Sequence, residues 1–236
     1  MLVAAVLGGG VYLLTKDDDP VTKPVSTTVA PVDTSGPVST ETAASSLPPT
    51  GESIASDAML TVLRRITAES GVTATESVNL DGCPAGDLRQ MAAAGPAVVQ
   101  SIAGSAEDPS SWVFQPDIVG EFPLVNCAMD SSDFASGIGI GMGEAIDDFE
   151  NDLSIVLPEF IVTIEASTPH LGGTIVRFCA DPIGVDGDLR PFCEADWYDD
   201  NVWLGVFIGG DDRSSALAEE WLIAVLPDAA NQVANA

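Results

Sequence analysis

The chain of 236 residues is strongly acidic, with 36 Asp or Glu against eight Lys or Arg and a formal net charge of −28. Nucleic-acid binding depends on Lys and Arg that neutralise phosphates, so this composition excludes that class of partner. Docking to anionic lipid head groups is disfavoured for the same reason.

Residues 1–15 form an uncharged, apolar segment at the start of the chain. As a helix it would extend about 22 Å, whereas a bilayer core is about 30 Å thick. We therefore expect a membrane anchor whose first turn and basic flank lie upstream, and a cleaved signal peptide is the alternative. Up to residue 50, the flank that follows contains only Lys16 and Lys23 as basic residues, which favours a single-pass topology with the C-terminal domain outside the cytoplasm.

Residues 16–50 read as a disordered spacer. Between residues 20 and 50, six positions are Pro and 12 are Ser or Thr. Such a segment buries too little apolar surface to offset the entropy of ordering it, and its prolines favour an extended chain. A spacer after an anchor predicts a domain held away from the membrane.

Residues 51–236 are expected to form one extracytoplasmic globular domain. Thirty-one acidic residues and six arginines lie in this block, which leaves a charge of −25 without any lysine. A surface of this kind keeps a protein soluble and monomeric through repulsion, and recruitment of cations or of a basic partner is the alternative interpretation.

Apolar spacing within this block alternates between helical and strand-like periods. Helices are expected at residues 53–69, 84–102 with a bend at Gly95-Pro96, 144–157 and 214–226; strands are expected at 112–114, 122–129, 134–141, 160–166, 174–180 and 202–208. The order predicts an α+β fold, a mostly antiparallel sheet with helices packed on one face. Short similar runs, Asn126–Asp130 and Phe178–Asp181, leave a duplicated helix–βββ unit open.

Four cysteines, an even number in a domain outside the cytoplasm, predict two disulfides. They are Cys83, Cys127, Cys179 and Cys193, and none has the spacing of a zinc site. Sequential pairing is favoured because Cys179 and Cys193 bracket a short loop with two Gly and two Pro. We expect both bridges to be structural.

Two acidic regions are candidate sites. A calcium site could use the carboxylates in or beside the loop between the last two cysteines, namely Asp181, Asp186, Asp188 and Glu194, although their spacing does not match the helix-loop-helix calcium pattern. A ligand-binding surface could use aromatic faces and carboxylates at Trp197, Tyr198, Asp199 and Asp200. For each, a structural role is the competing interpretation.

Other motifs point to structure rather than chemistry. The glycines of GIGIGMG (137–143) alternate and match neither the dinucleotide nor the Walker spacing, so close packing on one strand face is expected. His170, the single histidine, lies in a turn without a G-x-S-x-G elbow elsewhere, and we expect it to be exposed and non-catalytic. No cofactor motif is present.

The layout resembles that of anchored, spacer-mounted envelope proteins of high-GC Gram-positive bacteria, a resemblance of plan that implies no site residues. Together these features predict a non-catalytic domain that binds or senses a ligand at the cell envelope, with a glycan, peptide or protein as its partner. The alternative is a structural or accessory subunit of an envelope complex.

Overall fold

The computed structural model describes residues 53–73, 77–114, 124–131, 136–157, 159–183 and 189–236. The predicted anchor, residues 1–15, and spacer, residues 16–50, lie outside these ranges. Within the described ranges, no helix is both long enough and apolar enough to cross a membrane.

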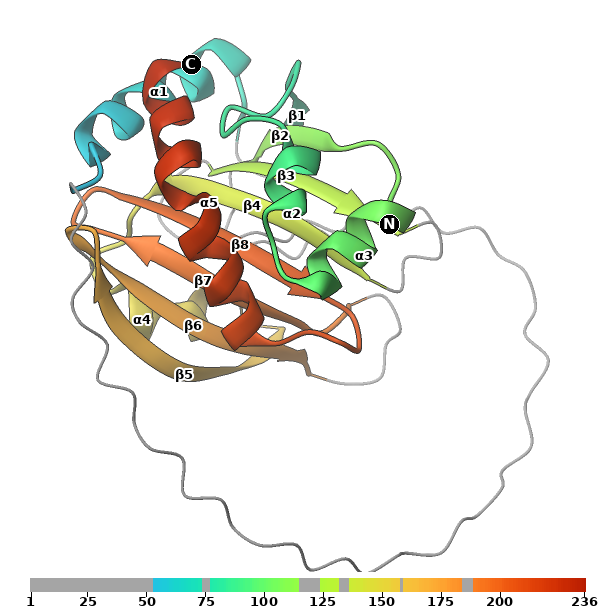
Figure 1. Ribbon diagram of the computed structural model, residues 1–236. Helices are drawn as coiled ribbons and strands as arrows, with labels where there is room; N and C mark the ends of the chain where they lie inside the picture. The colour runs from blue at the N-terminus through green and yellow to red at the C-terminus, as the bar shows by residue number, and fades with distance from the viewer. Residues whose placement is uncertain (1–52, 74–76, 115–123, 132–135, 158, 184–188) are drawn as a thin grey trace, which may run out of the picture.

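The described elements form an α+β fold (Figure 1). The helices are α1 (Ser56–Ser70), α2 (Leu88–Ala93), α3 (Ala97–Ser105), α4 (Phe149–Val156) and α5 (Ser215–Asn235). The strands are β1 (Ser77–Asn79), β2 (Ser110–Phe114), β3 (Leu124–Asp130), β4 (Gly137–Glu144), β5 (Phe160–His170), β6 (Gly173–Pro182), β7 (Phe192–Tyr198) and β8 (Val202–Gly209).

All eight strands belong to one antiparallel sheet in the order β1-β2-β3-β4-β8-β7-β6-β5. Each half is a run of four consecutive strands, and β4 and β8 join the halves with Gly141 opposite Gly205. The predicted α+β fold with an antiparallel sheet is confirmed. The duplicated helix–βββ unit stays a prediction. The two halves are alike in number of strands, with four each, but the helices that follow them, α4 and α5, lie on opposite faces.

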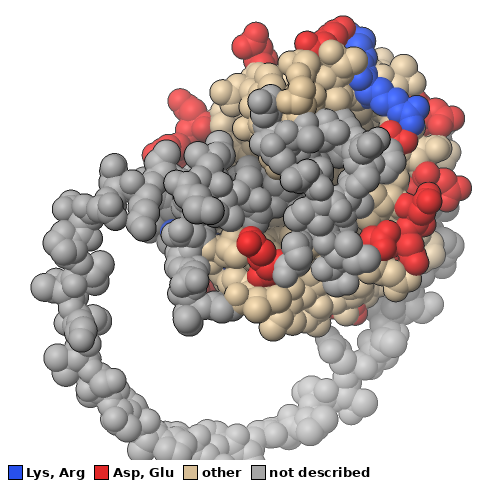
Figure 2. Space-filling model, turned by 180° about the vertical axis from the view of Figure 1, so that it is seen from behind, with Lys and Arg blue, Asp and Glu red and all other residues tan. Residues whose placement is uncertain are grey.

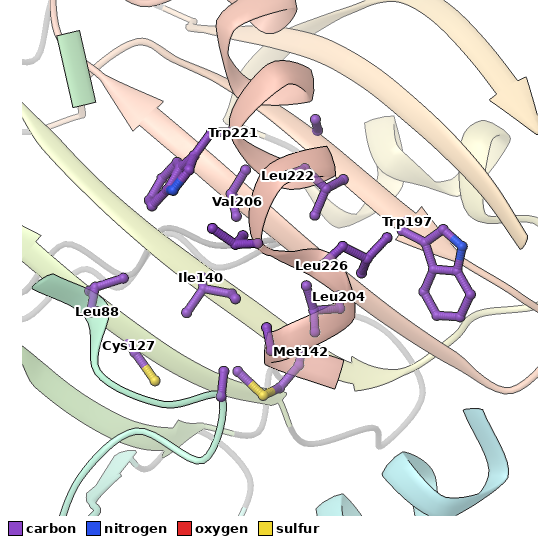
Figure 3. Packing of buried hydrophobic residues seen from close by; sticks show 14 of the residues in the cluster. Leu88, Cys127, Ile140, Met142, Trp197, Leu204, Val206, Trp221, Leu222 and Leu226 are labelled. Atoms are coloured by element: carbon purple, nitrogen blue, oxygen red, sulfur yellow. The ribbon is translucent and has the colours of Figure 1, made fainter. Parts of the chain in front are cut away.

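One face of the sheet, here called the α5-side face, is covered by α1, α2, α3 and α5 (Figure 1). Ile138, Ile140 and Met142 of β4 point to this face because side chains alternate along a strand. The α5 residues Trp221, Leu222 and Leu226 pack onto strand side chains here (Figure 3). At roughly 1.5–3 kcal/mol for each large apolar side chain, this cluster is a principal source of stability.

The opposite face, here called the α4-side face, carries a second apolar cluster. Phe149 and Leu153 of α4 pack there with Phe178, Trp203 and Phe207 from the strands. Gly139 allows this packing, because a Cβ added to it would lie 2.2 Å from the Phe207 ring. The expectation that the alternating glycines serve close packing is confirmed at this position.

Both disulfides are present with the predicted sequential pairing, Cys83–Cys127 and Cys179–Cys193. Cys127 belongs to the α5-side cluster. Cys179 and Cys193 are directly opposite each other on β6 and β7 and alternate with residues of the α4-side cluster. The covalent cross-links therefore reinforce the α5-side face.

Four features differ from expectation. Helices lie on both faces of the sheet and not on one, because Phe149 and Leu153 of α4 pack into the cluster on the α4-side face. The predicted helix at 84–102 is broken into α2 and α3 around Gly95 and Pro96, as the expected bend suggested. Helix α5 continues past Pro227 to Asn235, because Ala229, Ala230 and Val233 extend its buried stripe and offset the lost hydrogen bond. Strand β7 was not predicted.

Candidate functional site

Strand β7 brings two carboxyl groups into the interior of the protein. Its odd-numbered residues Cys193, Ala195 and Trp197 point to the α5-side face, so Glu194 and Asp196 point to the α4-side face. Both carboxyl side chains are fully buried, at 0% exposure. Charged residues are almost never buried without a partner, which makes this pair the least expected feature of the fold.

The space for Asp196 comes from the absent side chain of Gly205, its direct neighbour on β8. A Cβ added to Gly205 would lie 1.6 Å from Oδ1 of Asp196 and 3.1 Å from Oε1 of Glu194. The Asp196 carboxyl group therefore lies over the backbone of Gly205, and an oxygen of Glu194 is close to the same point. Residue 205 has to be glycine for the pair to fit.

Burial and mutual repulsion keep a proton on this carboxyl pair. Burial raises the pKa of Asp196 to about 7. The pKa of Glu194 is raised well above its usual value, first by burial and then by the negative charge of Asp196. Two adjacent buried carboxyl groups cannot both ionise cheaply, so a proton shared between them is the stable arrangement at neutral pH.

Two further buried polar residues lie on the same face. Directly opposite pairs define one row across five strands, from Trp112 and Asn126 through Gly141 and Gly205 to Asp196. Asn126 is 0% exposed and Trp112 is 5% exposed. The α4-side face therefore has carboxyl groups at one end of this row and an amide and an indole N–H at the other. We call Trp112, Asn126, Glu194 and Asp196 the polar site.

Within the described part of the chain, no polar side-chain atom of the polar site has a hydrogen-bond partner outside the site. Nε1 of Trp112 and both amide atoms of Asn126 are buried and unpaired, and the buried carboxyl oxygens of Glu194 and Asp196 have only each other as partners. Each such atom costs about 1–3 kcal/mol, and native proteins seldom retain several of them together. A cluster of this kind indicates a role other than stabilising the fold.

The surroundings of the polar site are aromatic. Tyr198 stacks on Phe149 with ring centroids 4.8 Å apart, and its hydroxyl donates to Oε1 of Glu150 at 3.0 Å. Ser167 donates to the same oxygen at 2.7 Å. Partial burial, together with this hydrogen bond, raises the pKa of Tyr198 to about 12, so the hydroxyl stays protonated.

The predicted ligand-binding stretch is not brought together on one surface. Trp197 is 1% exposed, and its Nε1 donates to the carbonyl of His170 at 2.8 Å on the α5-side face. Tyr198 points to the other face, and Oδ1 of Asp199 accepts from the backbone N–H of Val202 at the hairpin turn. Of the four residues, Asp200 alone is exposed.

The residues of the predicted calcium site are also separated. Asp181 is exposed at the end of β6 and pairs with Arg213 at 2.7 Å, whereas Glu194 is buried on the other face. Asp186 and Asp188 lie outside the described residues. Among the residues that the structure describes, no group of three or more His, Cys, Asp or Glu could hold a metal ion.

Sequence reasoning missed the polar site because it did not predict β7. The local pattern assigns Glu194 to a loop and Asn126 to one of two short similar runs, and it assigns no role to Asp196. One signal was available: Phe192–Tyr198 alternates, with apolar or small residues at every second position. Carboxylates two residues apart in a strand share a face.

Unlike the polar site, the surface of the domain carries charged side chains that are exposed to solvent. Acidic side chains are spread over the α4 side of the molecule, and the basic side chains visible there lie mainly near one edge (Figure 2).

The expectation that His170 is exposed is wrong. This residue is half-buried at the β5–β6 hairpin, and burial lowers its pKa.

Comparison of the chain with family models, with curated proteins and with solved structures found no match.

Proposed function

We propose that this protein is a membrane-anchored, single-pass envelope protein whose outer domain binds or senses a small polar ligand without catalysis. The polar site supports ligand binding, because its unpaired donors and acceptors are the groups that a bound molecule would satisfy. The apolar segment, the spacer and the two disulfides support a location outside the cytoplasm.

Binding is favoured over catalysis by the neighbours of the carboxyl pair. The residues directly opposite Glu194 and Asp196 in the sheet are Val176, Phe178, Gly205 and Phe207. These residues supply no further nucleophile or base. The pair itself is held protonated by burial, which suits a hydrogen-bonding or charge-sensing role.

A thermal-shift experiment on the full-length protein tests this proposal. The probes are four compounds related to bacterial cell walls: N-acetylglucosamine, glucosamine, alanyl-alanine and glycerol phosphate. We expect at least one to raise the melting temperature of the wild type and to lose this effect in Asn126→Leu. Asn235→Leu, a change at an exposed position of α5, is the matched control. Equal shifts in all three proteins, or no shift with any probe, would contradict the proposal.

The alternative, an accessory subunit of an envelope complex, is supported by β5. This strand is 11 residues long, and among the described strands it pairs with β6 alone. Ile161 and Ile164 are 60% and 41% exposed along it. A long edge with exposed apolar side chains can accept a strand from a partner. Ile161→Lys would abolish such an association, measurable by co-purification with envelope proteins, and would leave ligand binding unchanged.

A further inference from the structure

We propose that the polar site binds small organic amines that carry a hydrogen-bond acceptor at their other end. This inference rests on the proposed function, because it names the class of ligand for the same site. It is based on the polarity of the site: acceptors at one end of the row and donors at the other.

The carboxyl end of the site calls for a cation. Glu194 and Asp196 together present four oxygens, none of which is paired with a basic side chain. Their sheet neighbours Val176, Phe178 and Phe207 are uncharged. An ammonium group has three N–H donors and no acceptor, so it can bond to both carboxyl groups and neutralise the one negative charge that the pair retains beside its shared proton.

Residues from α4 add no competing cation. Phe149, Leu153 and Leu157, which pack into the α4-side cluster, are apolar. Oε1 of Glu150, an acidic residue of α4, accepts hydrogen bonds from the hydroxyl groups of Tyr198 and Ser167. Arg190, whose neighbour Leu189 packs against the α4-side cluster, interacts with Asp130, and no described basic side chain shifts the pKa of Glu194 or Asp196. Among the described side chains, a positive charge at the pair therefore has to come from a ligand or a proton.

A divalent metal fits this site less well than an amine does. Calcium takes six to eight oxygen ligands, whereas the described residues contain no group of three metal-binding side chains. The geometry of an ammonium group is less demanding, because two carboxyl acceptors and one further acceptor satisfy it.

The opposite end of the site offers donors. Nε1 of Trp112 and Nδ2 of Asn126 are both unpaired, and the two residues are directly opposite each other on β2 and β3. A hydroxyl or carboxylate group would accept from both. Asn126 and Asp196 are three strand spacings apart, about 14 Å across the sheet. The Asp196 carboxyl group lies over Gly205, one strand closer to Asn126, which leaves two spacings, or about 10 Å. A ligand about as long as ε-aminocaproate matches this distance.

Isothermal titration calorimetry on the full-length protein tests this inference with two matched pairs of probes. Glucosamine is compared with glucose, and ε-aminocaproate is compared with caproate, which lacks the amine. We expect one or both amines to bind at least about tenfold more tightly than the matched compound. Glu194→Gln and Asp196→Asn should each weaken amine binding by about tenfold. Asp212→Asn, which removes an exposed carboxylate, should have no effect.

The outcomes separate this inference from the proposed function. Binding of glucose or caproate as tight as that of the amines, lost in Asn126→Leu, would overturn the amine inference and leave the ligand-binding function standing. Amine binding unaffected by Glu194→Gln and Asp196→Asn would overturn it as well, because the amine would then bind elsewhere. Absence of binding by all four probes would also contradict the inference, whereas the thermal-shift panel tests the proposed function separately.

Discussion

The two faces of the sheet are built in contrasting ways. The α5-side face has four helices, both disulfides and a continuous apolar cluster. Its two indole groups are paired: Trp197 donates to the carbonyl of His170 at 2.8 Å, and Trp221 donates to the carbonyl of Met91 at 3.0 Å. The α4-side face has one short helix and buries unpaired polar atoms among aromatic rings. The contrast indicates that one face stabilises the domain and can support an energetically costly site on the other.

The largest expected effect is on the α5-side face. Trp221→Ala should lower the free energy of unfolding by about 3–5 kcal/mol, because it removes a side chain that is 0% exposed and leaves a cavity. Ile223→Ala on the same helix, at a position that is 44% exposed, is the control and should change stability by less than about 0.5 kcal/mol. Chemical denaturation measures both. A similar small loss for the two variants would break the comparison.

Loss of a disulfide is the next largest effect. Replacing Cys83 and Cys127 with Ala should cost about 4 kcal/mol, because this bridge closes a loop with a sequence separation of 44. The bridge between Cys179 and Cys193 has a separation of 14 and should contribute about 3 kcal/mol. Thermal unfolding of the two double variants tests this order. The reverse order would show that chain entropy does not dominate.

A smaller loss of stability is expected at Gly205, which leaves room for the carboxyl pair. Gly205→Ala should destabilise the domain by about 1–3 kcal/mol, because the new Cβ would overlap the Asp196 carboxyl group. Adding Asp196→Ala should recover most of this loss. Gly104→Ala in α3, where nothing lies within 4 Å of an added Cβ, is the control and should be neutral or stabilising. Additive losses in the double variant would contradict the assigned contact.

The carboxyl pair also predicts a dependence of stability on pH. The pKa of Asp196 rises from 3.8 to about 7 on folding, so the folded protein binds more protons than the unfolded chain between these values. The free energy of unfolding should therefore fall as pH rises through this window. Asp196→Asn should flatten the profile relative to Asp212→Asn. Parallel profiles for the two variants would contradict the shared proton.

The smallest effect concerns the acidic surface. Repulsion among exposed carboxylates is screened by salt over a Debye length of about 8 Å at physiological ionic strength. The melting temperature should therefore rise as NaCl increases from low to moderate concentration. Salt should screen the repulsion within the polar site less, because this site is buried. A melting temperature that stays flat or falls would show that surface repulsion is a minor term.

The sequence predicted the α5-side face better than the α4-side face, for a physical reason. The helical spacing of Leu217, Trp221 and Leu222 predicts a buried helix face, and the even number of cysteines predicts disulfides. Both signals can be read without knowing how the strands pair. The polar site instead depends on register: Asp196 meets Gly205, and Asn126 meets Gly141, only because the strands pair as they do. Residues far apart in the chain cannot reveal such pairing through their own local pattern.

The central claim is that the polar residues of the α4-side face serve binding rather than folding, and Asn126 tests it most directly. Asn126→Leu replaces a buried, unpaired amide with an apolar group of similar volume. Equilibrium unfolding of the full-length protein at neutral pH should give a free energy equal to or higher than that of the wild type. A loss of more than about 2 kcal/mol would show that the amide is a structural element, and it would contradict the account.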